Sequence, residues 1–275
     1  MSRTRKTTGG NSPVKHFVSF SGATGKIKYF EKGHPDANEK GQVELESLDF
    51  ILLDVKSSIS GFNEKTESNI SSNKINPFDI KKVPFVVRTK VDKKFEVFAE
   101  GLYDDIKDKV SSIGGKFTTN LFALADLGSG YEIISIELNG SSLTPWIELM
   151  DKIEKEDDDI YNHVVSITKG DMMTRGKGKN VKVTKKQVDD FKAALAKDPM
   201  TPRPVWFYVP DFSLSDLSEE DSELAVVADE KLQTYFDEAG GSKQDSSNGT
   251  VKESATVESP QPAGDFEEDD DDLPF

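Results

Sequence analysis

Short stretches of alternating apolar and polar residues make up most of the chain as far as Pro210. In these stretches β-branched and aromatic residues recur at every second position, which is the period of a strand with one buried face. Gly, Pro, Asn and Ser gather between the stretches and mark turns. We predict strands over residues 14–20, 26–31, 43–55, 83–89, 94–99, 116–125, 131–138, 160–168 and 205–209.

The segments between these strands differ in character. The loop 21–25 contains two glycines and predicts a hairpin between the first two strands, and the turn residues Asn139-Gly140 end a later strand. The Asn- and Ser-rich residues 63–76 predict a mobile excursion, and the glycine-punctuated residues 169–186 predict a basic loop.

Four segments have the 3.6-residue apolar period of helices. One covers residues 103–113 and stops at Gly114-Gly115, and a second covers 145–153 with Pro145 at its first position. A third begins at Thr184 with the capping-box spacing to Gln187, and an acidic helix covers 218–239. Many short strands with few helices predict a mainly β fold, either a barrel or a sandwich with helical additions.

Composition excludes several classes of site. The 275 residues include no Cys, so disulfides and thiolate metal sites are ruled out. The three histidines, His16, His34 and His163, lack a paired ligand spacing, and we expect no metal and no cofactor. The first residues are basic without an apolar core, and no stretch is apolar enough to cross a membrane. We therefore expect a soluble cytoplasmic protein.

The net charge of −15 is distributed unevenly. Residues 211–275 hold 20 acidic and 3 basic residues, whereas residues 1–210 hold 32 basic and 30 acidic ones. Residues 1–30 carry six basic residues and no acidic one, and residues 169–186 carry seven against one. The chain therefore combines a body with basic patches and a strongly acidic C-terminal part.

The C-terminal part divides into a linker and a tip. Residues 240–264 are rich in Ser, Gly, Pro and Gln and cannot form a core of their own, which predicts a disordered linker. Residues 265–275 are an acidic run that stops in Leu273-Pro274-Phe275. An aromatic ring next to a carboxylate, behind a run of aspartates, is typical of a peptide that docks in an apolar pocket with a basic rim.

This ending resembles the C-terminal tip of bacterial single-stranded DNA-binding proteins. The resemblance implies that the tip recruits replication and repair proteins such as polymerase, helicase, primase or nuclease components. It assigns partner binding to the tip residues Asp269, Asp270, Asp271, Asp272, Leu273, Pro274 and Phe275.

The body is about twice as long as the compact OB domain of the bacterial family, and it looks more like the larger single-stranded DNA-binding proteins of phages. The expected fold is then an elaborated OB-fold barrel with added helices. The expected organisation is a flexible basic N-terminus (1–12), a DNA-binding domain (13–239), a linker (240–264) and a tip (265–275). The location would be the cytoplasm of a bacterial host.

The body contains the residue types that single-stranded DNA requires, namely cations for the phosphates and rings for the bases. Lysines flank Tyr29 on the second predicted strand, which favours this ring for stacking, and a second aromatic set lies before Pro210. The expected DNA-binding residues are Lys15, Phe17, Lys26, Lys28, Tyr29, Phe30, Arg175, Lys177, Lys179, Lys182, Arg203, Trp206 and Tyr208.

Two other classes stay open. An acidic-tailed chaperone for basic proteins would explain the charge of the tail, although it has no need of Leu273-Pro274-Phe275. A metal-dependent nuclease would need carboxylates gathered at strand ends. We find no nucleophile, base and acid in a recognisable arrangement, and we expect a binding protein rather than an enzyme.

Overall fold

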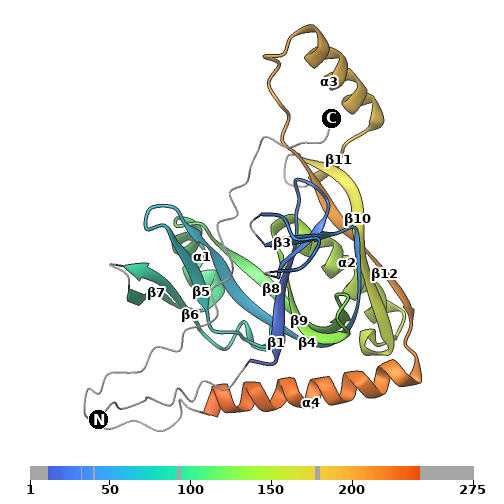
Figure 1. The fold of residues 1–275 in the computed structure, drawn as a ribbon. Coiled ribbons are helices and arrows are strands. Elements are labelled where there is room, and N and C mark those ends of the chain that lie inside the picture. The colour runs from blue at the N-terminus through green and yellow to red at the C-terminus, as the bar shows by residue number, and fades with distance from the viewer. Residues whose placement is uncertain (1–11, 32, 40, 92–93, 177–179, 242–275) are drawn as a thin grey trace.

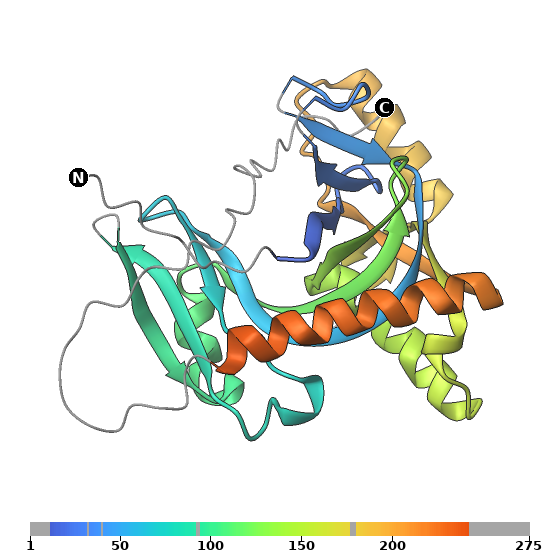
Figure 2. The same cartoon turned by 60° about the horizontal axis from the view of Figure 1, so that its bottom comes forward.

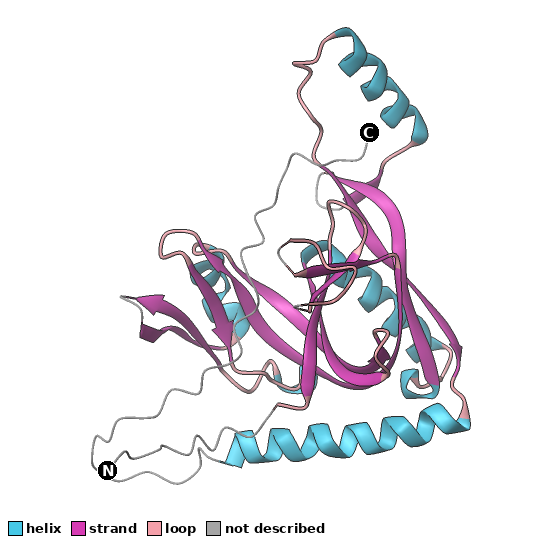
Figure 3. Ribbon diagram, viewed as in Figure 1, coloured by secondary structure: helices cyan, strands magenta, loops and turns pink. Residues whose placement is uncertain are grey.

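The computed structural model describes residues 12–31, 33–39, 41–91, 94–176 and 180–241. It is a strand-rich mixed α/β fold, and Figure 3 shows one large curved sheet with helices at its periphery. The predictions for residues 1–11 and 242–275, which include most of the linker and the whole tip, lie outside the described residues. Within the described part of the chain, no helix combines the length and apolar character needed to cross a membrane.

The strands are β1 (Val14–Phe20), β2 (Ile27–Phe30), β3 (Gln42–Leu45), β4 (Ser47–Asn63), β5 (Ser68–Ser72), β6 (Phe85–Val91), β7 (Lys94–Gly101), β8 (Gly115–Asp126), β9 (Tyr131–Asn139), β10 (His163–Arg175), β11 (Asn180–Lys182) and β12 (Trp206–Asp216). The helices are α1 (Tyr103–Ser111), α2 (Leu143–Lys155), α3 (Lys185–Lys197) and α4 (Glu219–Gly241), with short 3-10 turns η1 (Pro77–Asp79), η2 (Gly140–Ser142) and η3 (Ile160–Asn162).

The strands follow the order β3-β2-β1-β9-β8-β4-β5-β6-β7, and β10 joins β4 to β12 and β11. β1 and β9 are parallel, and the other pairs described are antiparallel. β4 is long enough to pair with β10 at its start, with β8 along its middle and with β5 at its end. In Figure 1 β5–β7 lie at the left, whereas β1 and β3 lie in the middle of the view, where they overlap β8 and β9.

The part of the sheet from β3 to β4 must curl. In a flat sheet these strands would be five spacings apart, roughly 24 Å. Only Glu46 separates them along the chain, so Leu45 and Ser47 lie within about 7 Å of each other. The inside of the curl is filled by one apolar cluster to which β1, β2, β3, β4, β8, β9, β10 and α2 contribute, and which includes Val18, Phe50 and Ile136. The curl leaves no closed barrel among the described strands.

The other side of the same strands is buried in part by α4. Leu232 and Ala228 pack with Phe122, Leu124 and other residues of β4, β8 and β9. Figure 2 shows α4 lying across these strands. A separate core joins α1 to β4–β7, around residues such as Ile59, Phe85 and Val110.

The distal part of β10, together with β11, α3 and the segment that leads to β12, forms a projection that we call the arm (residues 171–205, of which 177–179 lie outside the described residues). In Figure 1 α3 stands away from the sheet, at the far side of the molecule from α4. α3 begins at Thr184, whose hydroxyl accepts a hydrogen bond from the backbone N–H of Gln187, as the capping-box spacing predicts. The ring of Phe191 packs edge-on against Trp206, with centroids 5.5 Å apart, and holds α3 on β12.

Three predictions about segments are wrong. Residues 63–76 contain β5, because Ser71 and Ser72 pair with β6. Residues 169–186 are a β-hairpin and a helix start rather than a loop, since β10 continues to Arg175 and pairs with β11. The predicted strand 43–55 is two strands, because β3 and the start of β4 pair with different partners.

Candidate nucleic-acid interface

One side of the curled sheet carries a row of polar residues across six strands. Directly paired residues of neighbouring strands point to the same side of a sheet. Successive pairs follow this row from β4 through β8, β9, β1 and β2 to β3. We call the side that carries it the polar face; it lies opposite the core inside the curl, and α4 covers part of it over Phe122 and Leu124. The row consists of Lys56, Asn120, Glu137, Ser19, Lys28 and Glu44.

A neighbouring row on the polar face is partly aromatic. Phe122, which is buried beneath α4, pairs with Ser135, and Ser135 pairs with Phe17. Because Val18 pairs with Tyr29, Phe17 and Phe30 are neighbours on this face, and both are half-buried. The structure therefore brings together three of the predicted residues, Phe17, Phe30 and Lys28, on one side of β1 and β2.

Lys74 lies over the centre of the polar face. Its Nζ is 4.5 Å from the centroid of the Phe122 ring. Desolvation lowers the pKa of Lys74 although the side chain is exposed, and the nearby Glu137 opposes this shift. Burial raises the pKa of Glu137, and Lys74 opposes that shift. The Lys74 ammonium is thus partly surrounded by protein, next to Phe122 and Glu137, and we call this place the recess.

The β6–β7 hairpin extends the polar face with half-buried cations and an exposed ring. Val87 packs in the second core with Ile59, so Arg88 and Lys90 point to the opposite side. Lys90 pairs with Phe95, and its Nζ is 5.1 Å from the centroid of that ring. Phe95 is 47 % exposed.

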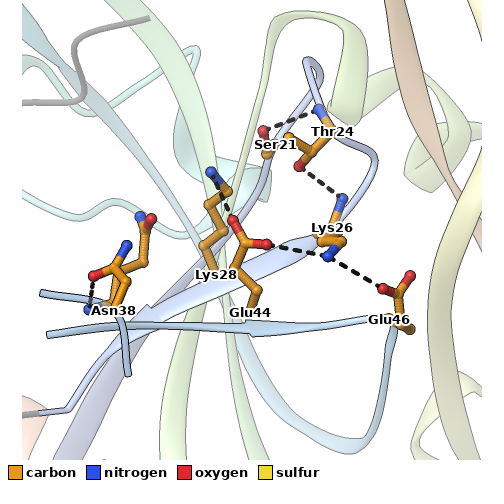
Figure 4. Close-up of polar contacts among 8 residues, drawn as sticks. Ser21, Thr24, Lys26, Lys28, Asn38, Glu44 and Glu46 are labelled. Atoms are coloured by element: carbon orange, nitrogen blue, oxygen red, sulfur yellow. Dashed lines mark hydrogen bonds and ion pairs between the residues drawn. The ribbon is translucent and has the colours of Figure 1, made fainter. Parts of the chain in front are cut away.

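Acidic residues of β3 neutralise the predicted lysines of β2. The Nζ of Lys26 lies 3.2 Å from Glu44 and 3.4 Å from Glu46, and that of Lys28 lies 3.2 Å from Glu44 (Figure 4). Burial favours a higher pKa for Glu44, but the hydrogen bonds from the two lysines outweigh it and hold the pKa below its usual value. Lys15 is exposed on β1 and belongs to no such pair among the described ion pairs.

Tyr29 does not lie on this face, and its expected role as a stacking ring is corrected. Its side chain is completely buried inside the curl, where it meets the rings of His16 and His34 edge-on. Since side chains alternate along a strand, placing Lys28 on the polar face sends Tyr29 into the core.

The remaining predicted residues belong to the arm and its base. Arg175, Lys182 and Arg203 are exposed, and Lys182 pairs with Asp171 at 2.6 Å. Lys177 and Lys179 lie outside the described residues. Trp206 contacts Phe191, so its ring has a structural partner.

Tyr208 connects the arm to the β1–β2 hairpin. Its backbone N–H donates to the carbonyl of Gly22 at 2.7 Å, and Lys169 places its Nζ 3.7 Å from the centroid of the Tyr208 ring. A side chain at Gly25 would come within 2.7 Å of Lys169. The two predicted DNA-binding sets, one near residue 28 and one near residue 206, therefore meet at this loop.

Reasoning from the sequence missed the residues at the centre and far end of the polar face. Lys90, Lys94 and Phe95 carry the same alternation of cation and ring as β2, on strands that were predicted, so this signal was available. No sequence pattern pointed to Lys74, because the residues around it show neither the alternation of a strand nor the period of a helix. The bridge between Ser57 and Ile75, together with the hydrogen bonds of the Asn73 side chain to the backbone of Pro84 and Val86, brings it to the sheet.

Neither a metal site among the described residues nor a known relative indicates the class of this protein. Among the described residues, no three His, Asp or Glu side chains gather closely enough to hold a metal ion. The chain matches no protein-family model, no curated protein and no solved structure.

Proposed function

We propose that this protein binds single-stranded DNA without sequence preference, on the polar face and the arm. The observation that carries the proposal is the alternation of cations and rings on one side of a continuous sheet. Lys90 and Phe95 supply it at one end, Phe17, Lys28 and Phe30 supply it at the other, and Lys74 lies between them. Cations along a path for phosphates, with rings for bases, are what binding without sequence readout requires.

The arrangement of charges favours a strand that crosses the sheet. Phosphates would approach the half-buried cations Arg88 and Lys90 of β6 and the exposed Lys74 directly. Lys26 and Lys28 must first give up their ion pairs with Glu44 before they can bind phosphate. Part of the affinity therefore comes from replacing one set of ion pairs by another, which is sensitive to salt.

We further propose that the curled part of the sheet is an elaborated OB-type barrel that stays partly open. Its support is the covalent proximity of β3 and β4 and the single core inside the curl. OB folds bind oligonucleotides on a sheet face and on the loops beside it. The β1–β2 loop with Gly22 and the arm residue Arg203 would then border the strand.

The tip completes the proposal. Residues Asp269, Asp270, Asp271, Asp272, Leu273, Pro274 and Phe275 would recruit replication and repair proteins. The support is the acidic run with its apolar end, since such a segment fits an apolar pocket with a basic rim. Phage-encoded proteins of this kind act in the cytoplasm of the bacterial host, where we place this one.

Electrophoretic or fluorescence titration with a dT oligonucleotide and with a duplex of equal length tests the proposal. We expect tighter binding of the single strand, with an affinity that falls linearly on a log–log salt plot at about 0.7 per phosphate neutralised. Equal affinity for the two forms, or no binding to either, would refute it.

A variant pair locates the binding surface. Phe95→Ala should weaken single-strand binding by about 1–3 kcal/mol if its ring stacks on a base. Tyr161→Ala is the matched control, because Tyr161 is 46 % exposed but has Asp54, Asp159 and Asp229 around it, where DNA is repelled. An equal loss in both variants would place the DNA elsewhere.

A further inference from the structure

α4 presents an acidic surface on the side away from the sheet. Its sequence has eight acidic residues and one basic residue. Ala228 and Leu232 face the sheet, whereas Glu223 and Glu230, two turns apart, are both exposed. Val226 and Val227 are 57 % and 51 % exposed, so apolar side chains lie beside the carboxylates.

The arm has the complementary character. Residues 171–205 include nine basic and four acidic residues. Met200 is 85 % exposed, Val205 71 % and Val181 46 %, which is unusual for apolar side chains on so small a projection. Lys185 and Lys197, at the two ends of α3, are exposed as well. Cations beside exposed apolar residues match a surface of carboxylates beside exposed valines.

These two surfaces cannot meet within one molecule. In Figure 1 the arm and α4 lie on opposite sides of the sheet, and Figure 2 also shows them apart. A contact between different surfaces of identical copies adds copies head to tail, and it gives an open row unless the rotation between neighbours closes a ring. We infer that the arm of one copy docks on α4 of the next, which builds a head-to-tail array of this chain.

The array goes beyond the proposed DNA binding, because its contact uses the outer side of α4 rather than the polar face. If the protein also coats a single strand, neighbouring copies would bind it cooperatively. The association is nevertheless a property of the protein alone and can be measured without DNA. A protein that binds DNA but does not associate would contradict the array alone, and a protein that associates but does not bind DNA would contradict the proposed function alone.

Sedimentation velocity of the full chain without DNA, at about 50 mM salt where charge screening is weak, tests the contact. The wild-type protein should grow in size continuously with concentration. Lys185→Glu with Lys197→Glu should abolish this growth, and so should Glu223→Lys with Glu230→Lys. An equimolar mixture of these two variants should grow again, since the native arm of one fits the native α4 of the other and the reversed arm fits the reversed α4.

Controls separate the contact from general charge effects and from misfolding. Lys152→Glu with Lys155→Glu on α2, and Asp105→Lys with Asp108→Lys on α1, make the same charge changes elsewhere and should associate like the wild type. Combining the arm and α4 substitutions in one chain should restore the growth in size with concentration, because the reversed arm fits the reversed α4. A misfolded variant would not regain this association. The inference is overturned if the wild type stays monomeric, forms only a closed dimer, or if the mixture of variants stays monomeric.

Discussion

Lys74 and Glu137 carry opposite charges in the same recess of the polar face. Desolvation lowers the pKa of Lys74, and burial raises the pKa of Glu137. The surrounding protein therefore disfavours the charged form of each residue. A phosphate entering the recess would favour the charged lysine and oppose the charged carboxylate. Substitutions of these two residues therefore test whether DNA reaches the centre of the sheet.

We expect Lys74→Met to weaken single-strand binding and to reduce the salt slope by about 0.7, the value for one phosphate contact. Glu137→Gln should strengthen binding by about 1 kcal/mol, because it removes a negative charge next to the path of the strand. Titrations at several salt concentrations measure both effects, and urea unfolding shows whether each variant is folded. Weaker binding by Glu137→Gln would mean that DNA does not enter the recess.

The hydroxyl of Tyr29 offers a second test on a single residue, this time of the core. It is buried and has no hydrogen-bond partner among the described residues. Tyr29→Phe keeps the ring and removes an unpaired polar group, so the free energy of unfolding should rise by about 1 kcal/mol while DNA binding stays the same. Chemical denaturation measures the change, and a clear loss of stability would show that the hydroxyl has a partner such as bound water.

Among the helices and strands, close backbone contacts join the α1 unit to the sheet. Gly114 follows α1 with φ +90°, and a Cβ at this position would lie 2.3 Å from the carbonyl oxygen of Phe62 at the end of β4. The Gly114-Gly115 pair thus does more than end a helix. It lets β4, β8 and α1 converge, and so places the β5–β7 end of the polar face.

Gly114→Ala should therefore cost more stability than its backbone conformation alone explains. Gly128 has φ +104°, and no atom lies within 4 Å of the place that a Cβ would take there, so Gly128→Ala isolates the conformational cost, about 1 kcal/mol. We expect Gly114→Ala to exceed this by at least about 1–2 kcal/mol in urea unfolding, since a backbone carbonyl must move. Equal losses of stability in the two variants would show that the backbone at Gly114 and Phe62 can move apart without a free-energy cost.

Over the full length of the protein, charge is separated between the body and the acidic C-terminal part. A linker of 25 residues, 240–264, has a root-mean-square reach of about 25–30 Å if it is a flexible coil. The acidic run would then compete with DNA for the cations of its own body at high effective concentration.

Deleting residues 265–275 should tighten single-strand binding, most strongly at low salt, and abolish capture of replication proteins in pull-down assays. Phe275→Ala should abolish capture too, yet leave DNA affinity nearly unchanged, because every carboxylate stays in place. Full capture by Phe275→Ala would show that the ring has no role, and the resemblance of the tip would then lose its main support.

Local patterns in the chain were enough to predict the four helices and most of the strands, but not β5 and β11, which lie in segments predicted as loops. β1, β9 and α4 begin or end within two residues of the predicted limits, because alternation, capping residues and glycine pairs act over a few neighbouring positions. The capping box at Thr184 and the hairpin at 21–25 are local in the same way. The tip also rests on local pattern, and it stays a prediction.

Which side of each strand is buried, and which distant residues meet, depended on the folded sheet. Alternation is the same whether Lys28 or Tyr29 faces the core, and the choice follows from packing inside the curl. Glu44 neutralises Lys28, and Lys74 reaches the polar face, through pairings between separate segments of the chain. Such contacts depend on how strands associate, which local periodicity does not encode, and for this reason the polar face became visible only once the strands were paired.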